Sequence, residues 1–593
     1  MRYVFDIETD GLLDKATKIH SLVLYNIDTD EVFSCADDQR FLSLQKGLRL
    51  LENAELLIGH NIICFDLPAL KKLYGLEVSA EIFDTLNACR LIWPDVLETD
   101  AKLKQIPTPL YGKHSLEAWG TRIGHKKGDY GATTDWKSWS LPMQKYCEND
   151  VELNVKLYRK IQAKNYSKRA LDLEMEFQDI IAQQERNGVC FDKAAAMKMY
   201  YQLRKDCDKF KADLQEMVGP IVKETPFIPK RDNKTKGYKK GVTFIKRSYS
   251  DFNCGSRTQI AEFLIKKYKW EPKEFTPTGR PKCSSDIIGK LPYEEAGIIA
   301  KYLTANKLLG MLGEGDKAWL RLERNGRLYG RMITNGTVTG RCSHQDPNLG
   351  QVPNTHAFLG AECRQLFKSS PGKVLVGADA KAIELRMLAH FLHPYDNGDY
   401  AKEILNGDIH CKNQASAELP TRDTAKRFIF AMCYGAGDEL LGSIIDPKAS
   451  REIHQRKGTR ARIMFYRNIP AFEKLKRNVE HTAKTRGHLI GLDGRHLPIR
   501  ESYRALNTLL QSSGAITMKM ANCIFWRMIK ERKLAVWQVL QVHDEISIEC
   551  APEIAQEVSD LLVDAIILAG EEFKLSIPLD GESKIGKNWM ECH

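Results

Sequence analysis

Two apolar, β-branched segments in the C-terminal half of the chain each end in an aspartate. Residues 374–378 lead into Asp379, and residues 539–542 lead into His543 and Asp544. A carboxylate at the point where such a strand meets water is available as a ligand. Two of them, brought together by folding, can hold two divalent cations about 3.5–4 Å apart, the arrangement used for in-line displacement at phosphorus. The pair therefore predicts two neighbouring strands that end in a two-metal site.

Length and composition predict a globular protein with several domains. The chain has 593 residues, of which 43% are hydrophobic and 28% charged, so it is not a disordered chain. Its net charge of +11 favours a polyanionic partner such as nucleic acid. The 15 cysteines form no Cys-x2–4-Cys pair, which argues against a zinc ribbon and predicts reduced thiols in a cytosolic protein. No apolar stretch approaches the ~20 residues that span a bilayer.

The apolar periodicity divides the chain into three regions. Residues 1–165 alternate short apolar strands with helical patterns, which is typical of an α/β domain. Residues 166–340 show mainly long amphipathic helices, interrupted by a basic loop at about 226–250. Residues 341–593 are mixed again, with helices between the two strands that end in aspartate.

A second set of carboxylates lies near the N-terminal end. Asp6 and Glu8 fall on one face of a strand, and Asp66 follows another apolar run. Asp150 lies one helical turn after Tyr146. Four carboxylates around two cations can activate a water molecule and stabilise a leaving oxygen in phosphodiester hydrolysis. Each acid alone is better explained as a helix cap or a solvated strand end, but the ordered combination favours a nuclease site.

Four side chains between the two aspartates recur every four residues. Arg422, Lys426, Phe430 and Tyr434 form a slowly drifting stripe on a helix. The two cations suit phosphate oxygens, and the two rings suit stacking on a base. An isolated stripe of this kind is more often an amphipathic helix with core aromatics and solvated cations. The spacing alone leaves both interpretations open.

Taken together, these motifs resemble two known families. Asp-x-Glu, Asn-x3-Phe-Asp and Tyr-x3-Asp, in that order, resemble the motifs of the DEDD exonucleases of the tyrosine subtype. Arg-x3-Lys-x3-Phe-x3-Tyr-Gly, between Asp-x4-Glu and His-Asp-Glu, resembles the motif set of the family A DNA polymerases. Residues 339–341 with 347–353 are similar to that family's primer-template motif, and residues 506–512 to its template-side helix. The resemblance covers the whole chain and is closest to the replicative polymerases of T-seven-like short-tailed phages.

The resemblance implies a multidomain α/β fold. An RNase H-like 3′–5′ exonuclease domain would occupy residues 1–165 and a helical thumb residues 166–340. Residues 341–593 would form the antiparallel-sheet palm and the helical fingers, with the fingers at about 395–485. The implied activity is template-directed DNA synthesis with proofreading. No 5′ nuclease domain is expected, because the exonuclease motif begins at residue 6.

The same resemblance assigns roles to residues. In the exonuclease, Tyr146 would orient the attacking water, and the metal ligands would be Asp6, Glu8, Asp66 and Asp150. In the polymerase, the metals would be held by Asp379, Asp544 and the carbonyl of Ala380. Each site would take two Mg²⁺ ions, with Mn²⁺ as a substitute.

Further residues would contact nucleotide and DNA. Arg422, Lys426 and His410 would bind the phosphates, and Phe430 and Tyr434 would form the nucleotide pocket. Glu384 would close off the space of a 2′-hydroxyl and so select deoxynucleotides. In this family a phenylalanine at the position of Phe430 accompanies rejection of dideoxynucleotides. The implied contacts to primer or template are Arg341, Gln351, Gln511 and His543, although His543 is also explained as a histidine packed beside the acids.

The basic loop is the main departure from the phage relatives, which carry a long thumb insertion that binds host thioredoxin. Here the stretch is only about residues 226–250, so thioredoxin binding is not expected. Its lysines, including Lys236, Lys239 and Lys240, are candidates for salt-sensitive contacts to DNA phosphates. A solvated, mobile loop explains the same composition equally well.

The expected partners are primer-template DNA and dNTPs, with a phage helicase-primase or a single-stranded DNA-binding protein as further candidates. A monomer without membrane attachment, in the cytoplasm of an infected bacterium, is expected. Three other classes of protein share part of this pattern. A single-subunit RNA polymerase shares the palm and a similar helix, but Glu384 and the exonuclease argue against it. A standalone exonuclease with a decayed polymerase part would not retain every polymerase motif. A pure DNA-binding protein would leave two complete ligand sets unused.

Overall fold

The computed structural model of the chain describes residues 1–128, 130–276 and 278–592, and it divides into two compact units. The first unit comprises residues 1–189, 330–351 and 369–593. The second comprises residues 190–329 and 352–368. His593, the last residue of the predicted palm, lies outside the described residues. Among the described residues, no helix is long and apolar enough to cross a membrane.

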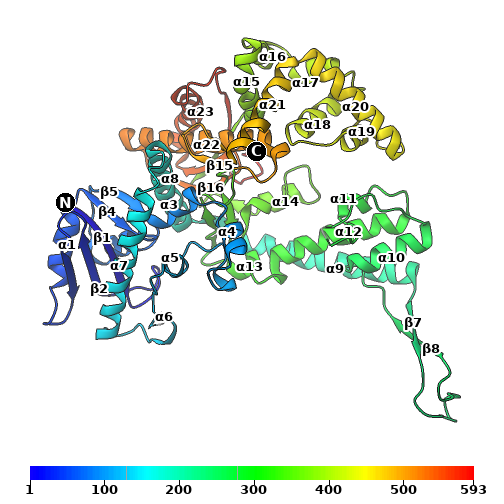
Figure 1. The fold of residues 1–593 in the computed structure, drawn as a ribbon, viewed down its shortest axis with the longest axis horizontal. Helices are drawn as coiled ribbons and strands as arrows, with labels where there is room; N and C mark the ends of the chain where they lie inside the picture. Colours follow the sequence, from blue (N-terminus) through cyan, green and yellow to red (C-terminus); the bar gives the residue numbers. More distant parts are fainter. Residues whose placement is uncertain (129, 277, 593) are drawn as a thin grey trace. The chain divides into compact units, whose positions relative to one another are not determined.

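A five-stranded sheet forms the N-terminal part of the first unit (Figure 1). Its strands are β1 (Arg2–Thr9), β2 (Ile19–Asn26), β3 (Val32–Ala36), β4 (Leu56–Gly59) and β5 (Glu81–Asp84). Their order is β3-β2-β1-β4-β5, with β1 antiparallel to β2 and parallel to β4. The mixed sheet with flanking helices confirms the predicted α/β class for this region.

Helices surround this sheet, and the longest, α7 (Leu141–Gln162), packs on β1 and β2. The others are α1 (Leu44–Glu52), α2 (Asp66–Tyr74), α3 (Thr85–Ile92), α4 (Val96–Leu103), η1 (Thr108–Leu110), α5 (Leu116–Ile123) and α6 (Tyr130–Thr133). The apolar side of α7 buries Val151 and Val155 against Val4, Val23 and Ile58 of the sheet. This packing fixes the rotation of α7 and therefore the direction of its polar residues.

A four-stranded antiparallel sheet, called the palm sheet below, lies in the C-terminal part of the first unit. Its strands are β13 (Val374–Ala380), β16 (Val536–Val542), β17 (Glu545–Cys550) and β18 (Gly581–Gly586), in the order β16-β17-β13-β18. The strands predicted before Asp379 and Asp544 are thus confirmed. The long helices that pack near this sheet are α8 (Lys168–Asn187), α22 (Ala505–Arg532) and α23 (Ala555–Glu572).

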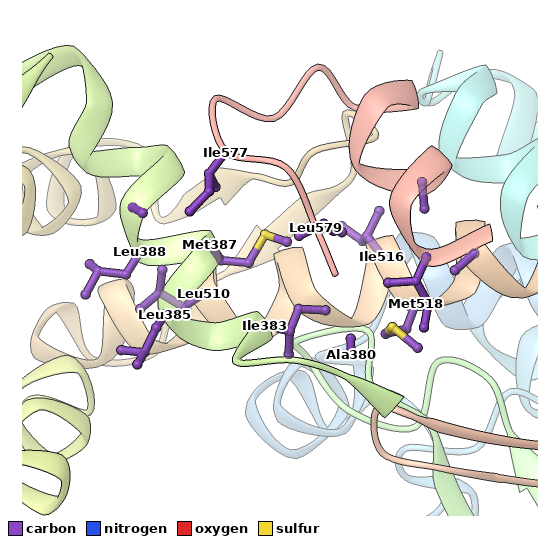
Figure 2. Packing of buried hydrophobic residues seen from close by; sticks show 14 of the residues in the cluster. Ala380, Ile383, Leu385, Met387, Leu388, Leu510, Ile516, Met518, Ile577 and Leu579 are labelled. Carbon is purple, nitrogen blue, oxygen red and sulfur yellow. The ribbon is translucent and has the colours of Figure 1, made fainter. Parts of the chain in front are cut away.

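Helices predominate between β13 and the hairpin β14 (His488–Ile490) and β15 (His496–Pro498). They are α15 (Ile383–Asp396), α16 (Asp399–Asn406), α17 (Ile409–Ser416), α18 (Arg422–Cys433), α19 (Asp438–Ile445), α20 (Arg451–Asn468) and α21 (Pro470–Arg486). Figure 2 shows the apolar core around α15, in which Met387 and Leu388 lie near Ile577, and Ile383 lies near Ile516 of α22. This core ties the base of the helical region to the palm sheet.

The shorter elements of the first unit are β10 (Arg331–Ile333), β11 (Ser343–Gln345), η3 (Leu349–Gln351), η4 (Ser502–Arg504) and η5 (Pro552–Ile554). The second unit is mainly helical, with α9 (Lys193–Val218), α10 (Arg257–Tyr268), α11 (Ser285–Ile288), α12 (Glu294–Leu309), η2 (Gly310–Glu314), α13 (Trp319–Leu322) and α14 (Gly360–Gln365). A three-stranded sheet joins β6 (Val189–Phe191), β9 (Arg327–Leu328) and β12 (Phe367–Lys368).

The predicted basic loop is a β-hairpin in the structure. Strands β7 (Ile221–Phe227) and β8 (Phe244–Ser250) pair antiparallel along their whole length. Sequence analysis missed these strands because their side chains are largely exposed on both faces, so they lack the apolar–polar alternation of a half-buried strand. The lysines named as DNA contacts lie beyond the paired strands, at the tip of the hairpin.

The compact units divide at residues other than the predicted limits of the thumb. Helix α8 was expected in the thumb, yet Phe177, Ile180 and Ile181 share a core cluster with the palm. The helix also packs on α22 and β16. Because an amphipathic pattern shows that a helix is covered but not what covers it, the sequence could not assign α8 to a unit. The functional limits of the thumb therefore stay a prediction.

Candidate active sites

The structure brings together all five residues predicted for the exonuclease. They line one pocket of about 190 Å³, together with Asn61, Phe65, Lys127 and Trp136. Asp6 and Glu8 come from β1, Asp66 begins α2, and Tyr146 and Asp150 lie one turn apart on α7. The backbone N–H of Ile7 donates to Oδ1 of Asp66 over 3.2 Å, which fixes the start of α2 against β1.

The donor set of this pocket suits a hard divalent cation. Ligand atoms of Asp6, Glu8 and Cys147 lie within 4.8 Å of one another, and Asp66 and Asp150 line the same pocket. Carboxylate oxygens are the ligands that Mg²⁺ prefers. Burial raises the pKa of the Cys147 thiol well above its usual value, so the sulfur stays protonated and is a poor ligand.

Burial raises the pKa values of all four carboxyls, and repulsion from the other acids of the set adds to it for Asp6 and Glu8. Burial is the larger cause for each, followed for Asp6 by Asp66, Glu8 and Asp150. The pKa of Glu8 rises to about 8, that of Asp66 to about 7 and that of Asp150 to about 6. Burial and nearby negative charge disfavour the ionised form of these acids, and bound cations would offset both effects. The electrostatics therefore fit the metals that the sequence implied.

Lys127 is a member of this pocket that sequence analysis missed. Its Nζ lies 2.7 Å from Oδ2 of Asp150 and 5.1 Å from the ring centroid of Tyr146. Burial lowers its pKa, but the carboxylate of Asp150 more than offsets this effect, and the net pKa is raised. The only local signal was a Lys-Lys pair bounded by Gly124 and Gly128, which is too common to single out a site.

The register of the palm sheet places the two C-terminal aspartates side by side. Asp379 of β13 is opposite Glu545, the first residue of β17. His543 and Asp544 form the tight turn that joins β16 to β17, so Asp544 directly precedes the partner of Asp379. His543 has a φ of 55°, the left-handed conformation this turn requires. Ala380 is buried at the end of β13, next to Asp379.

Charged neighbours surround Asp544. The pKa of its carboxyl is raised, and burial is the largest cause. Among the neighbouring charges, Arg341 and His543 lower this pKa and Glu384 raises it. Arg341, Glu384 and His543 are therefore the charged neighbours of the Asp544 carboxyl. Arg341, His543 and Asp544 also line a small shared pocket with Lys519.

Glu384 links the palm to the helical region. It lies in the first turn of α15, and its Oε1 accepts from Nη2 of Arg341 over 3.1 Å. Its Oε2 accepts from the hydroxyl of Tyr434 over 2.9 Å. A carboxylate held from two sides has a fixed position. Glu384 can therefore act as a rigid wall beside the aspartate pair.

The stripe on α18 faces outward. Tyr434 is 42% exposed, Phe430 is half-buried, and Arg422 and Lys426 are exposed. The core-facing positions of the helix are instead Phe428, Ile429 and Met432. Phe430 also packs against the edge of the core cluster, so the exposed members of the stripe are Arg422, Lys426 and Tyr434. The rings of Phe430 and Tyr434 lie 6.3 Å apart.

The cationic end of the stripe lies beside His410. Nε of Arg422 is 2.7 Å from Oδ2 of Asp408, and Oδ1 of Asp408 accepts from the backbone N–H of His410. Burial and then the charges of Arg422 and Lys426 lower the pKa of His410. The three groups predicted to bind phosphate are thus clustered, and Arg422 would exchange Asp408 for a phosphate.

The remaining predicted DNA contacts are dispersed. Gln511 is half-buried on α22, whereas Gln351 is exposed in η3. Lys236, Lys239 and Lys240 are exposed on the hairpin of the second unit. No described contact joins these five residues to the aspartate pair, so their roles rest on the sequence alone.

A buried charge network behind the site was also missed. Glu174 of α8 accepts from Lys519 over 2.6 Å and from Arg495 over 2.7 Å. Lys519 also donates to the carbonyl of Thr334 over 2.9 Å, and Arg495 pairs with Asp493. Glu174 is 345 residues from Lys519 and 321 residues from Arg495, so no local pattern marks them as partners.

Comparisons with known proteins assign both parts of the chain to families. Residues 3–162 match the family described as RNase_H superfamily, and residues 231–591 match the family described as DNA polymerase family A. The chain is 32% identical to the DNA-directed DNA polymerase of Enterobacteria phage T3 and 33% identical to that of Escherichia phage T7, over 100% of each protein. These alignments span 709 positions against 593 residues here. Both phage enzymes thus contain residues without a counterpart in this chain.

The fold is similar to that of a solved polymerase complex. The structure described as the POL domain of Pol1 from M. smegmatis, in complex with DNA primer-template and dNTP, aligns with a TM-score of 0.75. The two chains are 18% identical, and the alignment covers 99% of this chain and 96% of the other. At this identity the likeness concerns the fold.

Proposed function

Because this chain belongs to DNA polymerase family A, we propose that it is a phage replicative DNA polymerase that extends a primer with dNTPs and proofreads with its own 3′–5′ exonuclease. The observation that carries the proposal is the sheet register that sets Asp379 beside the turn of Asp544. A second carboxylate set in the RNase H-like domain supplies the opposing activity.

In the polymerase site, Asp379, Asp544 and the carbonyl of Ala380 would hold two Mg²⁺ ions. When bound, these ions lower the pKa of the primer 3′-hydroxyl and offset charge on the triphosphate. Arg422 and Lys426 would bind the phosphate oxygens from α18, since their side chains are exposed on one face. His410, which lies beside them, would contact the β-phosphate.

Selection of deoxynucleotides would rest on Glu384. Hydrogen bonds from Arg341 and Tyr434 hold its carboxylate in place, so it cannot yield to a 2′-hydroxyl without breaking one of them. Phe430 lacks a phenolic hydroxyl, which is consistent with rejection of dideoxynucleotides. These features favour DNA synthesis over the alternative of a single-subunit RNA polymerase.

In the exonuclease site, Asp6, Glu8, Asp66 and Asp150 would hold two divalent ions, and Tyr146 would orient the attacking water. The frayed end of a mispaired primer would enter as single strand.

The substrates would be primer-template DNA and dNTPs, as in the solved complex with the same fold. Arg341, Gln351, Gln511 and His543 would contact primer or template. Lys236, Lys239 and Lys240 would contact DNA phosphates from the hairpin, without host thioredoxin. We place the enzyme in the cytoplasm of an infected bacterium, as a monomer that works with a phage helicase-primase or single-stranded DNA-binding protein.

Extension of a primed template with dNTPs or with rNTPs, in Mg²⁺ and then in Mn²⁺, tests the proposal. We expect efficient extension with dNTPs and shortening of the primer when nucleotides are withheld. Efficient incorporation of rNTPs would instead support the RNA polymerase, and shortening without any extension would support a standalone exonuclease.

A further inference from the structure

Lys127 places a positively charged ammonium group in the exonuclease pocket. Among the described residues that line this pocket, it is the only lysine or arginine, against the four carboxylates of Asp6, Glu8, Asp66 and Asp150. Its side chain is only 24% exposed, and its ammonium lies 2.7 Å from Asp150. A lysine that merely solubilised the surface would extend into water instead.

The loop that bears Lys127 is fixed to the catalytic helix. The side-chain amide of Asn149 on α7 donates to the carbonyl of Lys126 over 3.2 Å and to that of Lys127 over 2.9 Å. Its Oδ1 lies 2.9 Å from Nε2 of His125. Asn149 directly precedes Asp150, so one turn of α7 positions both the lysine and its carboxylate partner. The ammonium thus has a defined place beside Tyr146 and Asp150.

The charges of the site leave a role for this cation. Four carboxylates and two divalent ions cancel formally, so the metal centre alone offers no net charge to a phosphodiester. The bound substrate brings one negative charge, and a further one develops at phosphorus as water attacks. In a site shielded from water, a fixed ammonium aimed at that charge stabilises it strongly.

We propose that Lys127 is a catalytic residue of the exonuclease, whose ammonium contacts a non-bridging oxygen of the scissile phosphate and stabilises the charge that develops there. This inference rests on the proposed exonuclease function. Lys127 would release Asp150 to the metals and turn its ammonium to the phosphate, which the long side chain permits.

The reaction that Lys127 would assist is hydrolysis of the terminal phosphodiester. The oxygen of water forms a bond to phosphorus, and the bond from phosphorus to O3′ of the penultimate nucleotide breaks. The hydroxyl of the water remains on the released 5′-monophosphate, and its other proton ends on O3′. Lys127 keeps its protons throughout and acts through charge alone.

The experiment compares Lys127→Ala, Lys127→Arg and the matched control Lys126→Ala in the full-length protein. Lys126 is the exposed neighbour on the same loop. Single-turnover excision of a single-stranded oligonucleotide is measured over a Mn²⁺ titration, and Mn²⁺ affinity is measured separately by electron paramagnetic resonance. Thermal melting of each variant reports its folding.

We expect Lys127→Ala to lower the excision rate at saturating Mn²⁺ by about 10²–10³-fold. Its Mn²⁺ affinity should stay the same or increase, because a cation that competes for Asp150 is gone. Lys127→Arg should recover part of the rate, and Lys126→Ala should excise like the wild type.

Two results would overturn the inference while leaving the exonuclease itself in place. One is excision by Lys127→Ala at the wild-type rate. The other is a loss of rate that follows a loss of Mn²⁺ affinity and disappears at saturating Mn²⁺, which would make Lys127 a support for the metal ligands. Failure of the wild-type protein to excise would overturn the proposed exonuclease and this inference together.

Discussion

The two carboxylate sites of this chain differ in how the protein surrounds them. In the exonuclease site, four acids share one small pocket; burial raises the pKa values of all four, and neighbouring acids of the set raise those of Asp6 and Glu8 further. In the polymerase site, two aspartates lie at a sheet end beside Arg341, Glu384 and the exposed face of α18.

The difference indicates two ways to build a two-metal site. In the exonuclease site, strand, helix and loop already bring the four carboxyls together, and bound cations would offset their charge. The polymerase fixes the aspartates and Glu384 but leaves Arg422 and Lys426 exposed, so the nucleotide itself would complete that site. Metals should therefore dominate the behaviour of the first site and the nucleotide that of the second.

Removal of a polymerase aspartate should have the largest effect. Asp544→Ala is expected to lower primer extension by at least about 10³-fold, because metal stabilisation of the transition state is worth several kcal/mol. Excision should persist, since the exonuclease ligands lie in a different sheet. Gel analysis of both reactions measures this, with Asp560→Ala on the exposed side of α23 as the matched control. Extension by Asp544→Ala at the wild-type rate would remove Asp544 from the site.

Glu384→Ala should relax the choice of sugar. Loss of this carboxylate opens the space beside the aspartates and frees Arg341 and Tyr434. We expect the preference for dNTP over rNTP to fall by about 10–100-fold, the range of one or two polar contacts. The ratio of kcat/KM values for dCTP and CTP measures the effect. An unchanged ratio would show that another residue excludes the ribose.

The raised pKa values of the exonuclease predict an unusual pH dependence. The carboxyls of Glu8 and Asp66, with pKa values near 8 and 7, bind protons in the folded protein that an unfolded chain releases near pH 4. The folded state without metal therefore loses stability as pH rises from about 4 to 8. Mg²⁺, which binds the ionised acids, should raise Tm by more at pH 8 than at pH 6.

Differential scanning fluorimetry with Mg²⁺ at the two pH values measures this dependence. Asp6→Ala combined with Glu8→Ala should abolish the difference, and Glu8→Gln should raise Tm of the metal-free protein at pH 8. A larger Mg²⁺ effect at pH 6 would contradict the assigned direction of the pKa shifts.

The hairpin lysines should have the smallest effect. Changing Lys236, Lys239 and Lys240 to alanine leaves the core untouched, because all three are exposed. If each contacts one phosphate, the slope of log K for DNA against log salt should fall by about 2–3. Fluorescence anisotropy across a salt series gives the slope. The same slope as the wild type would favour a solvated hairpin without DNA contact.

Much of both sites could be predicted from the sequence because their ligands follow apolar strands or recur along a helix. Asp6 lies within such a strand, Asp379 lies near the end of one and Asp544 follows one, and the stripe on α18 repeats every four residues. The missed residues make contacts that only the folded chain creates. Lys127 meets Asp150 across 23 positions, and Glu174 meets Lys519 across 345. The membership of α8 depended on packing partners that periodicity does not reveal, and the exposed hairpin strands show no apolar–polar alternation.

The most direct test of two separate sites uses a primer with a mismatched 3′ end, labelled at its 5′ end, with all four dNTPs present. The wild type should shorten and then extend it. Asp544→Ala should only shorten it. Asp6→Ala with Glu8→Ala should leave it in place while still extending a matched primer. Loss of both shortening and extension in either variant would contradict the assignment of separate sites.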